Sequence, residues 1–505
     1  MKKNLIYLLV ATSFLGVGCS EDFLDPLRDS RVLTAEEIAA AAEFNPAIVQ
    51  GGVDGLYNFL IEPGAVTGTQ HYDFGQKGVD IFLDLLSSDV ALSGNSYGWY
   101  QNTANLISTV DFTRTENRLI WTYYYKVIST SNEIINQLGG NDAVPTSVQS
   151  RHQYGQAKAL RAYAYFYLAQ IFQRTNDLSQ PILPYYNGTS ADTAAKVPAS
   201  QIYGLIVSDL LQAIDLLGNY TRPSKEKINA WVAKGLLAYA YAAQGNYAQA
   251  KVTSEDIINN SGFTLTTRVQ LASPPPPALP PAGSGFNDLN TPSWMWGFDL
   301  TTTLQHQLVD WWGQMDYYTY SYQWAGDRKT IDTRLLGAIP TGDIRKTQFG
   351  SGGVTNRMPI NKFFDPARVA GQQYIITTDL IFMRIDEFYL LSAEASAKTG
   401  DEATAKSRLK DLMTIRFAGG AAAADTYVNP LSGQALKNAI YLNTRIEMWG
   451  EGKSYLAMKR NEATVTRGTN HVFRSGSSFA FDIDELSFEI PQSEILNNPA
   501  ITGQN

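Results

Sequence analysis

The sequence predicts a mostly α-helical fold, in which a scaffold of helical hairpins carries a large loop-rich insertion. Three observations lead to this expectation. Apolar residues recur at helical spacing through much of the chain. One pair of predicted helices repeats the small-residue spacing of another pair, and the long interval between them is rich in Gly, Pro and Trp. With 505 residues, 44% of them apolar, the chain can bury a substantial core.

The chain opens with the pattern of an exported protein. Two lysines precede an apolar run over residues 5–17, which is shorter than the ~20 residues that a membrane-spanning helix needs. Cys19, the only cysteine, follows directly after a glycine. We therefore predict a lipoprotein signal peptide over residues 1–18, with lipidation of Cys19 anchoring the chain to a membrane; an ordinary secretory signal with an incidental cysteine is the alternative.

Composition excludes several classes of function. A net charge of -8 argues against nucleic acid, since phosphate binding needs a basic face. A single cysteine excludes an intrachain disulfide and a zinc site built on several thiolates. The four histidines are scattered without an HExxH pair. We expect neither a metal site nor a cofactor.

Periodicity places helices on both sides of the insertion. An i, i+3, i+4 stripe runs over residues 119–138, and two glycines end it. Other helices are expected near 148–172, 200–217, 228–245, 247–260, 381–399, 402–416 and 436–461. The scaffold thus spans about 116–260 and 380–461, within a single domain over residues 19–505.

Two of the expected helix pairs share their spacing of small residues. These are Ala238, Gly245 and Ala250 in one pair, and Ala393, Gly400 and Ala405 in the other. Alanine allows helices to approach closely, and glycine turns the chain between antiparallel helices. The spacing is typical of tetratricopeptide hairpins, with a generic helical hairpin as the alternative.

The insertion, about residues 262–379, begins with prolines at 274–277 and 280–281. Gly, Pro, Thr and Asp interrupt it too often for a long helix. It holds five of the nine tryptophans, which are Trp294, Trp296, Trp311, Trp312 and Trp324. Long irregular segments are usually functional or disordered, and this aromatic content argues against disorder.

Catalytic motifs appear only in fragments. Residues 94–98 fit the G-x-S-x-G pattern of a serine hydrolase, which would make Ser96 a nucleophile. No helical stripe follows them, although the hydrolase turn requires a helix there. Residues 452–454 end like a phosphate loop but lack its first glycine. We expect a protein that is not an enzyme.

Residues 384–395 fit the pattern R-x-x-E-x-Y-L-x-x-A-E-A, with Arg384, Glu387 and Glu394 as its charged positions. This pattern resembles a signature of the SusD/RagB family, the surface glycan-binding lipoproteins of Bacteroidota. Residues 444–453 resemble the family's second signature, with Thr444 in place of a glutamate and Lys453 in place of an arginine. The end of the chain, from Pro491 to Asn505, is similar to the family's C-terminus. Shorter matches lie earlier in the chain, at residues 52–58, 132–135 and 157–162.

The resemblance implies a tetratricopeptide-like scaffold that supports a loop-rich ligand face. It also implies an outer-membrane, cell-surface location and a TonB-dependent (SusC-like) transporter as partner. The family's function would be to capture oligosaccharide and deliver it to that transporter, although some members capture peptide instead. We expect four signature residues to form framework ion pairs rather than to bind ligand: Glu387, Glu394, Arg445 and Glu451.

The expected ligand site consists of aromatic side chains, because indole and phenol faces cover the C–H surfaces of sugars while amides bind the hydroxyls. Trp99 and Asn102 match one such loop of the family. The insertion supplies Trp311, Trp312 and Trp324, with Trp296 as a weaker candidate. Core packing is the alternative for each tryptophan.

Overall fold

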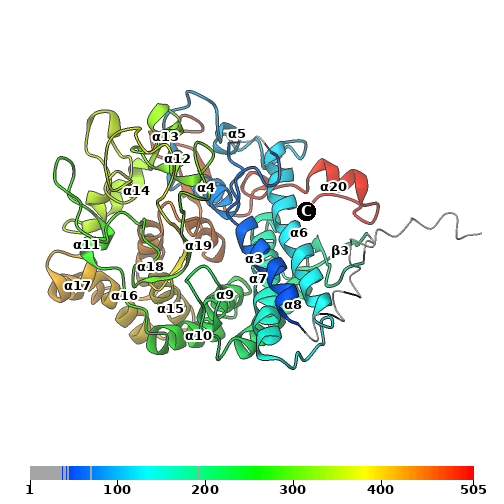
Figure 1. Ribbon diagram of the computed structural model, residues 1–505. Helices are drawn as coiled ribbons and strands as arrows, with labels where there is room; N and C mark the ends of the chain where they lie inside the picture. Colours follow the sequence, from blue (N-terminus) through cyan, green and yellow to red (C-terminus); the bar gives the residue numbers. More distant parts are fainter. Residues whose placement is uncertain (1–36, 38–40, 42–44, 69–70, 191–192) are drawn as a thin grey trace, which may run out of the picture.

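The computed structural model describes residues 37, 41, 45–68, 71–190 and 193–505 (Figure 1). The predicted signal peptide and Cys19 lie outside this part of the chain. Within it, no helix is long and apolar enough to cross a membrane.

Long helices in the first half of the chain form one side of the molecule. They are α3 (Ala47–Phe59), α6 (Thr115–Gln137), α7 (Val148–Phe172) and α8 (Ala199–Leu216). Helix α7 lies between α6 and α8, and from residue 153 onward all of its residues are buried. Its many alanines, such as Ala159 and Ala162, let both neighbours approach.

The two helix pairs predicted from small-residue spacing are confirmed. Helices α9 (Ala230–Ala243) and α10 (Tyr247–Asn260) form one hairpin, and α15 (Asp386–Lys398) and α16 (Glu402–Arg416) form the other. Gly245 and Gly400 adopt φ of 74° and 84° at the two turns, where a side chain would be strained. All four alanines of the pattern are fully buried. Helix α10 packs against α15, so the hairpins stack.

Two expected helices differ from the structure. Residues 380–384 form strand β6 (Leu380–Arg384), which pairs antiparallel with β4 (Trp294–Phe298) of the insertion. The helix expected over 436–461 is divided into α18 (Gly433–Glu447) and α19 (Ser454–Arg460). Gly450 and Gly452, with φ of 78° and 73°, turn the chain between them.

Other helices were not predicted. Helix α4 (Gln76–Leu86) is buried at every position, so no amphipathic stripe marks it. Helix α17 (Gly420–Val428) follows α16, and α20 (Gln492–Asn497) lies near the C-terminus. Strands β2 (Pro181–Pro184) and β3 (Lys196–Pro198) pair with each other, as do β7 (Val465–Thr466) and β8 (Ser478–Phe479).

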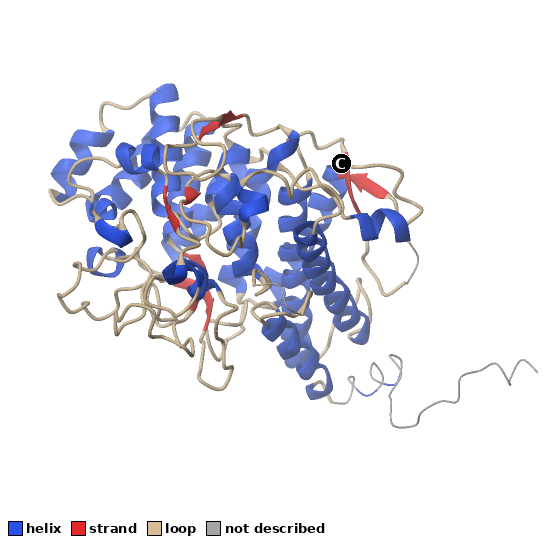
Figure 2. Ribbon diagram, turned by 90° about the horizontal axis from the view of Figure 1, so that it is seen from above, coloured by secondary structure: helices blue, strands red, loops and turns tan. Residues whose placement is uncertain are grey.

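The insertion consists of loops and short elements, and Figure 2 shows loops gathered along one side of the helices. Its helices are α11 (Arg268–Leu271), α12 (Trp311–Met315), α13 (Tyr322–Ala325) and α14 (Thr333–Ala338). Its strand β5 (Lys329–Ile331) pairs antiparallel with β1 (Val90–Leu92). The pairing brings the segment after β1, which includes α5 (Gln101–Ala104), beside the insertion.

A buried ion cluster joins the insertion to the scaffold. Glu447 accepts hydrogen bonds from Arg345, Arg384 and Arg416 at 2.7–3.1 Å. Burial alone would raise the pKa of Glu447, but the three arginines outweigh it and hold that pKa well below its usual value. Arg384 also binds Glu451 at 2.8 Å.

The expected framework role of the signature residues is confirmed for three of the four. Glu451 pairs with Arg384, Glu394 with Arg460 at 2.9 Å, and Arg445 with Asp89. Glu387 instead accepts a hydrogen bond from the Tyr239 hydroxyl at 2.7 Å. Because these four side chains form ion pairs or hydrogen bonds with other residues of the protein, they stabilise the arrangement of the helices.

Candidate functional site: an aromatic surface on the loop-rich side

Three of the tryptophans predicted to bind ligand are core residues, which corrects that expectation. Trp296, Trp311 and Trp312 expose 2% or less of their surface. Trp296 lies in β4, and its indole N–H donates to the Glu226 carbonyl at 3.0 Å. None of the three presents a ring face to solvent.

The burial of Trp311 and Trp312 has a simple structural reason. Both lie in the short helix α12 rather than in an open loop. Their rings meet edge to face at 5.1 Å, and Trp311 contacts the edge of Phe363 at 4.8 Å. Such contacts stabilise an aromatic core, so these tryptophans hold the insertion together.

Trp99 lies at the surface in a half-buried aromatic cluster. Its indole stacks on the His71 ring at 4.7 Å and meets the edge of Tyr322 at 5.9 Å. Tyr97, two residues earlier, contacts Tyr322 at 5.5 Å and leaves 62% of its surface exposed. Burial lowers the pKa of His71, which favours the neutral ring against Trp99.

The carboxylate of Asp327 fixes the backbone under this cluster. It accepts the N–H of Tyr97 at 2.7 Å and the N–H of Trp99 at 3.0 Å. Asp327 is fully buried, and hydrogen bonds to a charged acceptor are the stronger ones. Its carbonyl accepts Lys329 Nζ at 2.9 Å, and burial lowers the pKa of that lysine to about 7.

Trp324 belongs to a second, more exposed group of rings. Its ring centroid lies 5.4 Å from that of Tyr320, which in turn lies 4.9 Å from that of Tyr374. The planes of neighbouring rings are tilted by 37° and 35°, and Tyr320 is the middle ring of this row of three. Their exposed fractions are 43% for Tyr320, 39% for Trp324 and 56% for Tyr374.

The backbone of Gly371 packs directly against the indole ring of Trp324. A Cβ at this position would come within 2.7 Å of the indole Cε2, and the residue has φ of 62°. Both facts require glycine here. The Trp324 ring therefore rests directly on the backbone of residue 371.

Helix α13 joins the two groups of rings. Tyr322 lies between Tyr320 and Trp324 in the chain and contacts both Tyr97 and Trp99. We call the exposed and half-exposed rings of the two groups the aromatic surface. It comprises Tyr97, Trp99, Tyr320, Trp324 and Tyr374.

The sequence predicted that the amide of Asn102 would hydrogen-bond the ligand, but in the structure this amide contacts another residue of the protein. Its Nδ2 donates to Glu116 Oε1 at 3.1 Å, which ties α5 to the first turn of α6. Gln101 is more exposed, and its Oε1 accepts from Asn95 Nδ2 at 3.0 Å. The exposed amide of Gln101, two residues from Trp99, is a further polar group beside the rings that the sequence did not single out.

Ser96 lacks the geometry of a hydrolase nucleophile. Strand β1 precedes it, but α5 begins only at Gln101, so no sharp strand-to-helix turn presents the serine. Among the described residues, no histidine hydrogen-bonds to Ser96. Its hydroxyl lies against Gly326 instead.

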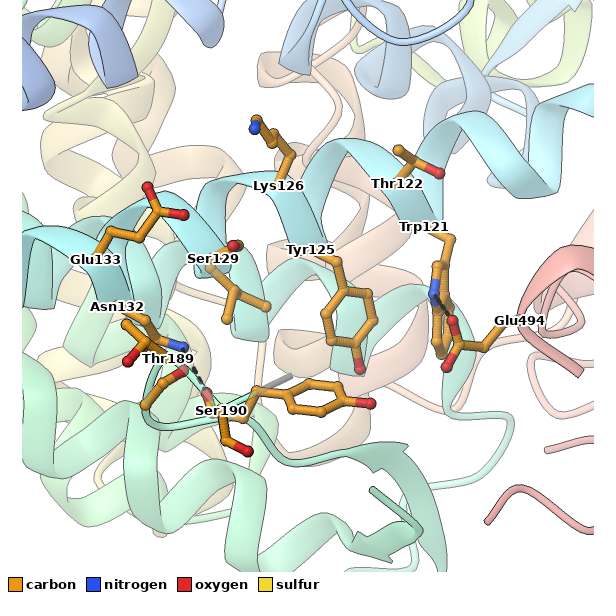
Figure 3. Close-up of a pocket in the computed structure, with 13 residues that line it drawn as sticks. Trp121, Thr122, Tyr125, Lys126, Ser129, Asn132, Glu133, Thr189, Ser190 and Glu494 are labelled. Carbon is orange, nitrogen blue, oxygen red and sulfur yellow. Dashed lines mark hydrogen bonds between the residues drawn. The ribbon is translucent and has the colours of Figure 1, made fainter. Parts of the chain in front are cut away.

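A separate groove of about 440 Å³ lies on the scaffold, between α6 and residues 186–190 (Figure 3). Its two large aromatic side chains hydrogen-bond within the protein: Trp121 Nε1 donates to Glu494 at 3.3 Å, and the Tyr125 hydroxyl donates to the Pro184 carbonyl at 3.0 Å. Trp121 is only 5% exposed. Because this groove has no open indole face, the aromatic surface is the better candidate for a ligand with apolar faces.

Two family models match the chain. One, described as "Starch-binding associating with outer membrane", matches residues 67–242, and the other, described as "SusD family", matches residues 310–505. The chain therefore belongs to the SusD/RagB family, as the signature segments predicted.

Known relatives agree with this assignment. A SusD-like protein of Bacteroides ovatus is 22% identical over 53% of the chain and 46% of its own length, and a SusD-like protein of Formosa agariphila is 24% identical over 52% and 48%. The chain thus spans about half the length of these curated relatives.

Solved structures share the whole fold. A SusD-like carbohydrate binding protein from Bacteroides vulgatus has a TM-score of 0.74 at 23% identity, covering 90% of this chain and 97% of its own. Surface glycan-binding protein A from Bacteroides uniformis has a TM-score of 0.67 at 18% identity, covering 91% and 99%. The mostly α-helical fold class predicted from the sequence is confirmed.

Proposed function

We propose that this protein captures oligosaccharide on its aromatic surface and delivers it to a TonB-dependent outer-membrane transporter. The observation that carries the proposal is the exposed row of Tyr320, Trp324 and Tyr374. A lipid on Cys19 would hold the protein at the cell surface, and no catalytic step is needed.

The chemistry of the row suits a sugar chain. Aromatic faces cover the C–H patches of pyranose rings, while the phenol hydroxyls of Tyr320 and Tyr374 can exchange hydrogen bonds with sugar hydroxyls. Successive rings 5 Å apart and tilted by about 35° can contact a curved glycan at several positions. The amides of Asn95 and Gln101 add donors and acceptors near Trp99.

The comparisons support the same class of ligand. One family description contains the words "starch-binding", and two structural neighbours are named for binding carbohydrate or glycan. The description "associating with outer membrane" supports the proposed location.

Isothermal titration of the protein against a panel of polysaccharides tests the capture step. We expect heat with at least one glycan, and loss of that heat in Trp324→Ala. If no glycan gives a heat of binding while peptide mixtures do, the proposal is wrong and the protein captures peptides instead. Co-purification with a SusC-like barrel encoded beside the gene tests delivery separately; purification without any such barrel would remove that part.

A further inference from the structure

A second cavity, of about 970 Å³, opens on the insertion. Its walls include α11 with the proline-rich loop that follows it, the residues before Tyr320, the loop over 342–355, and residues 360–361, 368–370 and 418. The sequence singled out the proline-rich segment without assigning it a role. The cavity is large enough for more than one sugar ring.

The lining of this cavity is cationic, although the whole chain is acidic. Arg268, Lys346 and Arg368 line it, and Asp343 is the only acidic side chain among the described lining residues. Asp343 is not free to bind a ligand, because both of its carboxylate oxygens bind Arg345. The cavity therefore presents an excess of positive charge.

Two of the three cations, Arg268 and Lys346, retain donors for a ligand. Arg268 uses Nη1 on the carbonyls of residues 415 and 416, and no hydrogen bond of its Nε or Nη2 is found among the described residues. Lys346 is exposed, and its ammonium makes no ion pair in the described part of the chain. An arginine fork and an ammonium together suit a carboxylate or a sulfate.

Arg368 is held rigidly in the cavity wall. Its guanidinium lies 4.0 Å from the Phe364 ring, and it donates to the carbonyls of Pro274 and Ile360 at 2.6 and 3.0 Å. Its Nε has no hydrogen-bond partner among the described residues. None of the groups it binds is a carboxylate, so its charge adds to the positive potential of the cavity.

Residues of the cavity wall are close neighbours in the chain of residues that form or support the aromatic surface. Tyr317 and Tyr318 line the cavity just before Tyr320. The N–H of Gly371 donates to the Tyr317 carbonyl at 3.3 Å, and Gly371 supports the Trp324 ring. The segments 317–324 and 368–374 therefore carry both the rings of the second group and part of the cavity wall.

We propose that this cavity binds an anionic unit, a uronic acid or a sulfated sugar, of the glycan held on the aromatic surface. The inference rests on the proposed function and adds the substrate class. Arg268 and Lys346 contact the acid group, while Tyr317 lies against a neighbouring ring. The protein then selects acidic over neutral glycans by charge.

The test is titration calorimetry of wild type, Lys346→Glu and the control Lys346→Arg at low and at physiological salt. The probes are oligogalacturonate, a sulfated galactan oligosaccharide and a neutral galactan oligosaccharide of equal length. We expect one anionic probe to bind more tightly than the neutral one, more so at low salt. Lys346→Glu should weaken it at least about tenfold, and Lys346→Arg less than about threefold.

Each result separates the two proposals. Tightest binding by uronate identifies the carboxylate, and tightest binding by sulfated galactan identifies the sulfate ester. If a neutral glycan binds as tightly as the anionic probes, or Lys346→Glu leaves their affinity unchanged, the acidic site is wrong while capture on the aromatic surface stands. If no glycan of any charge binds, both proposals fall.

Discussion

The buried carboxylate of Asp327 accepts the backbone N–H of Trp99 at 3.0 Å, although 228 residues separate the two in the chain. Asp327 follows α13, which carries Trp324. One side chain thus holds the Trp99 loop beside the second group of rings. The aromatic surface depends on this contact for its shape.

Replacing Asp327 should therefore weaken ligand binding without touching a ring. Asp327→Ala removes the acceptor of two charge-assisted hydrogen bonds, and we expect a stability loss of about 2–3 kcal/mol. Urea unfolding measures the stability, and calorimetry measures affinity on the folded protein. The exposed Asp482→Ala is the control. If Asp327→Ala binds glycan as tightly as wild type, the Trp99 loop does not need the hydrogen bonds to Asp327 for binding.

Gly371→Ala should displace the Trp324 ring. The added Cβ would lie 2.7 Å from the indole, and alanine disfavours φ of 62°. We expect a stability loss of about 1–2 kcal/mol and reduced glycan affinity. Gly204→Ala, on α8 with nothing within 4 Å of its Cβ, is the control. Unchanged tryptophan fluorescence and affinity in Gly371→Ala would contradict this account.

Trp312→Ala should act on stability rather than on recognition. The side chain is fully buried, so its removal leaves a cavity that costs about 3–5 kcal/mol. Trp99→Ala, at a half-buried position stacked on His71, should cost about 1–2 kcal/mol and also weaken binding. Thermal unfolding of both variants shows which one loses more stability. A smaller stability loss for Trp312→Ala than for Trp99→Ala would contradict our assignment of Trp312 to the core and Trp99 to the surface.

Glu447 should stabilise the fold in a pH-dependent way. Its pKa is lowered by three arginines, so its ionised form contributes stability above the unfolded pKa, about 4.3, and this contribution is lost as the pH falls toward the lowered value. Glu447→Ala leaves three buried arginines short of a partner and should cost about 3–5 kcal/mol at pH 7. Urea midpoints from pH 7 to pH 3 should show the difference from wild type shrinking in acid. If the difference in urea midpoint between wild type and Glu447→Ala stays constant from pH 7 to pH 3, ionised Glu447 is not what stabilises the wild type.

The sequence predicted the scaffold well because its helices have either an apolar stripe or a repeated small-residue spacing. Helix α6 and the hairpins at Gly245 and Gly400 carry these signals. Helix α4 carries neither, since it is buried all round. The division at Gly450 and Gly452 was missed because the apolar pattern continues past it.

The site was predicted less well, for a physical reason. Exposure of a tryptophan in an irregular segment depends on contacts with distant residues, such as Phe363 for Trp311 and β6 for Trp296. Trp99 and Trp324 lie at the surface as expected. Tyr374 had no sequence signal, because its contact with Tyr320 arises only when two loops run side by side.

The most direct measurement is titration of wild type and Trp324→Ala with the same glycan panel, with thermal unfolding of both. Trp324 is 39% exposed, so we expect nearly equal melting temperatures and at least about tenfold weaker binding in the variant. Equal affinity of the two proteins for a glycan that wild type binds would contradict the aromatic surface as the site of capture.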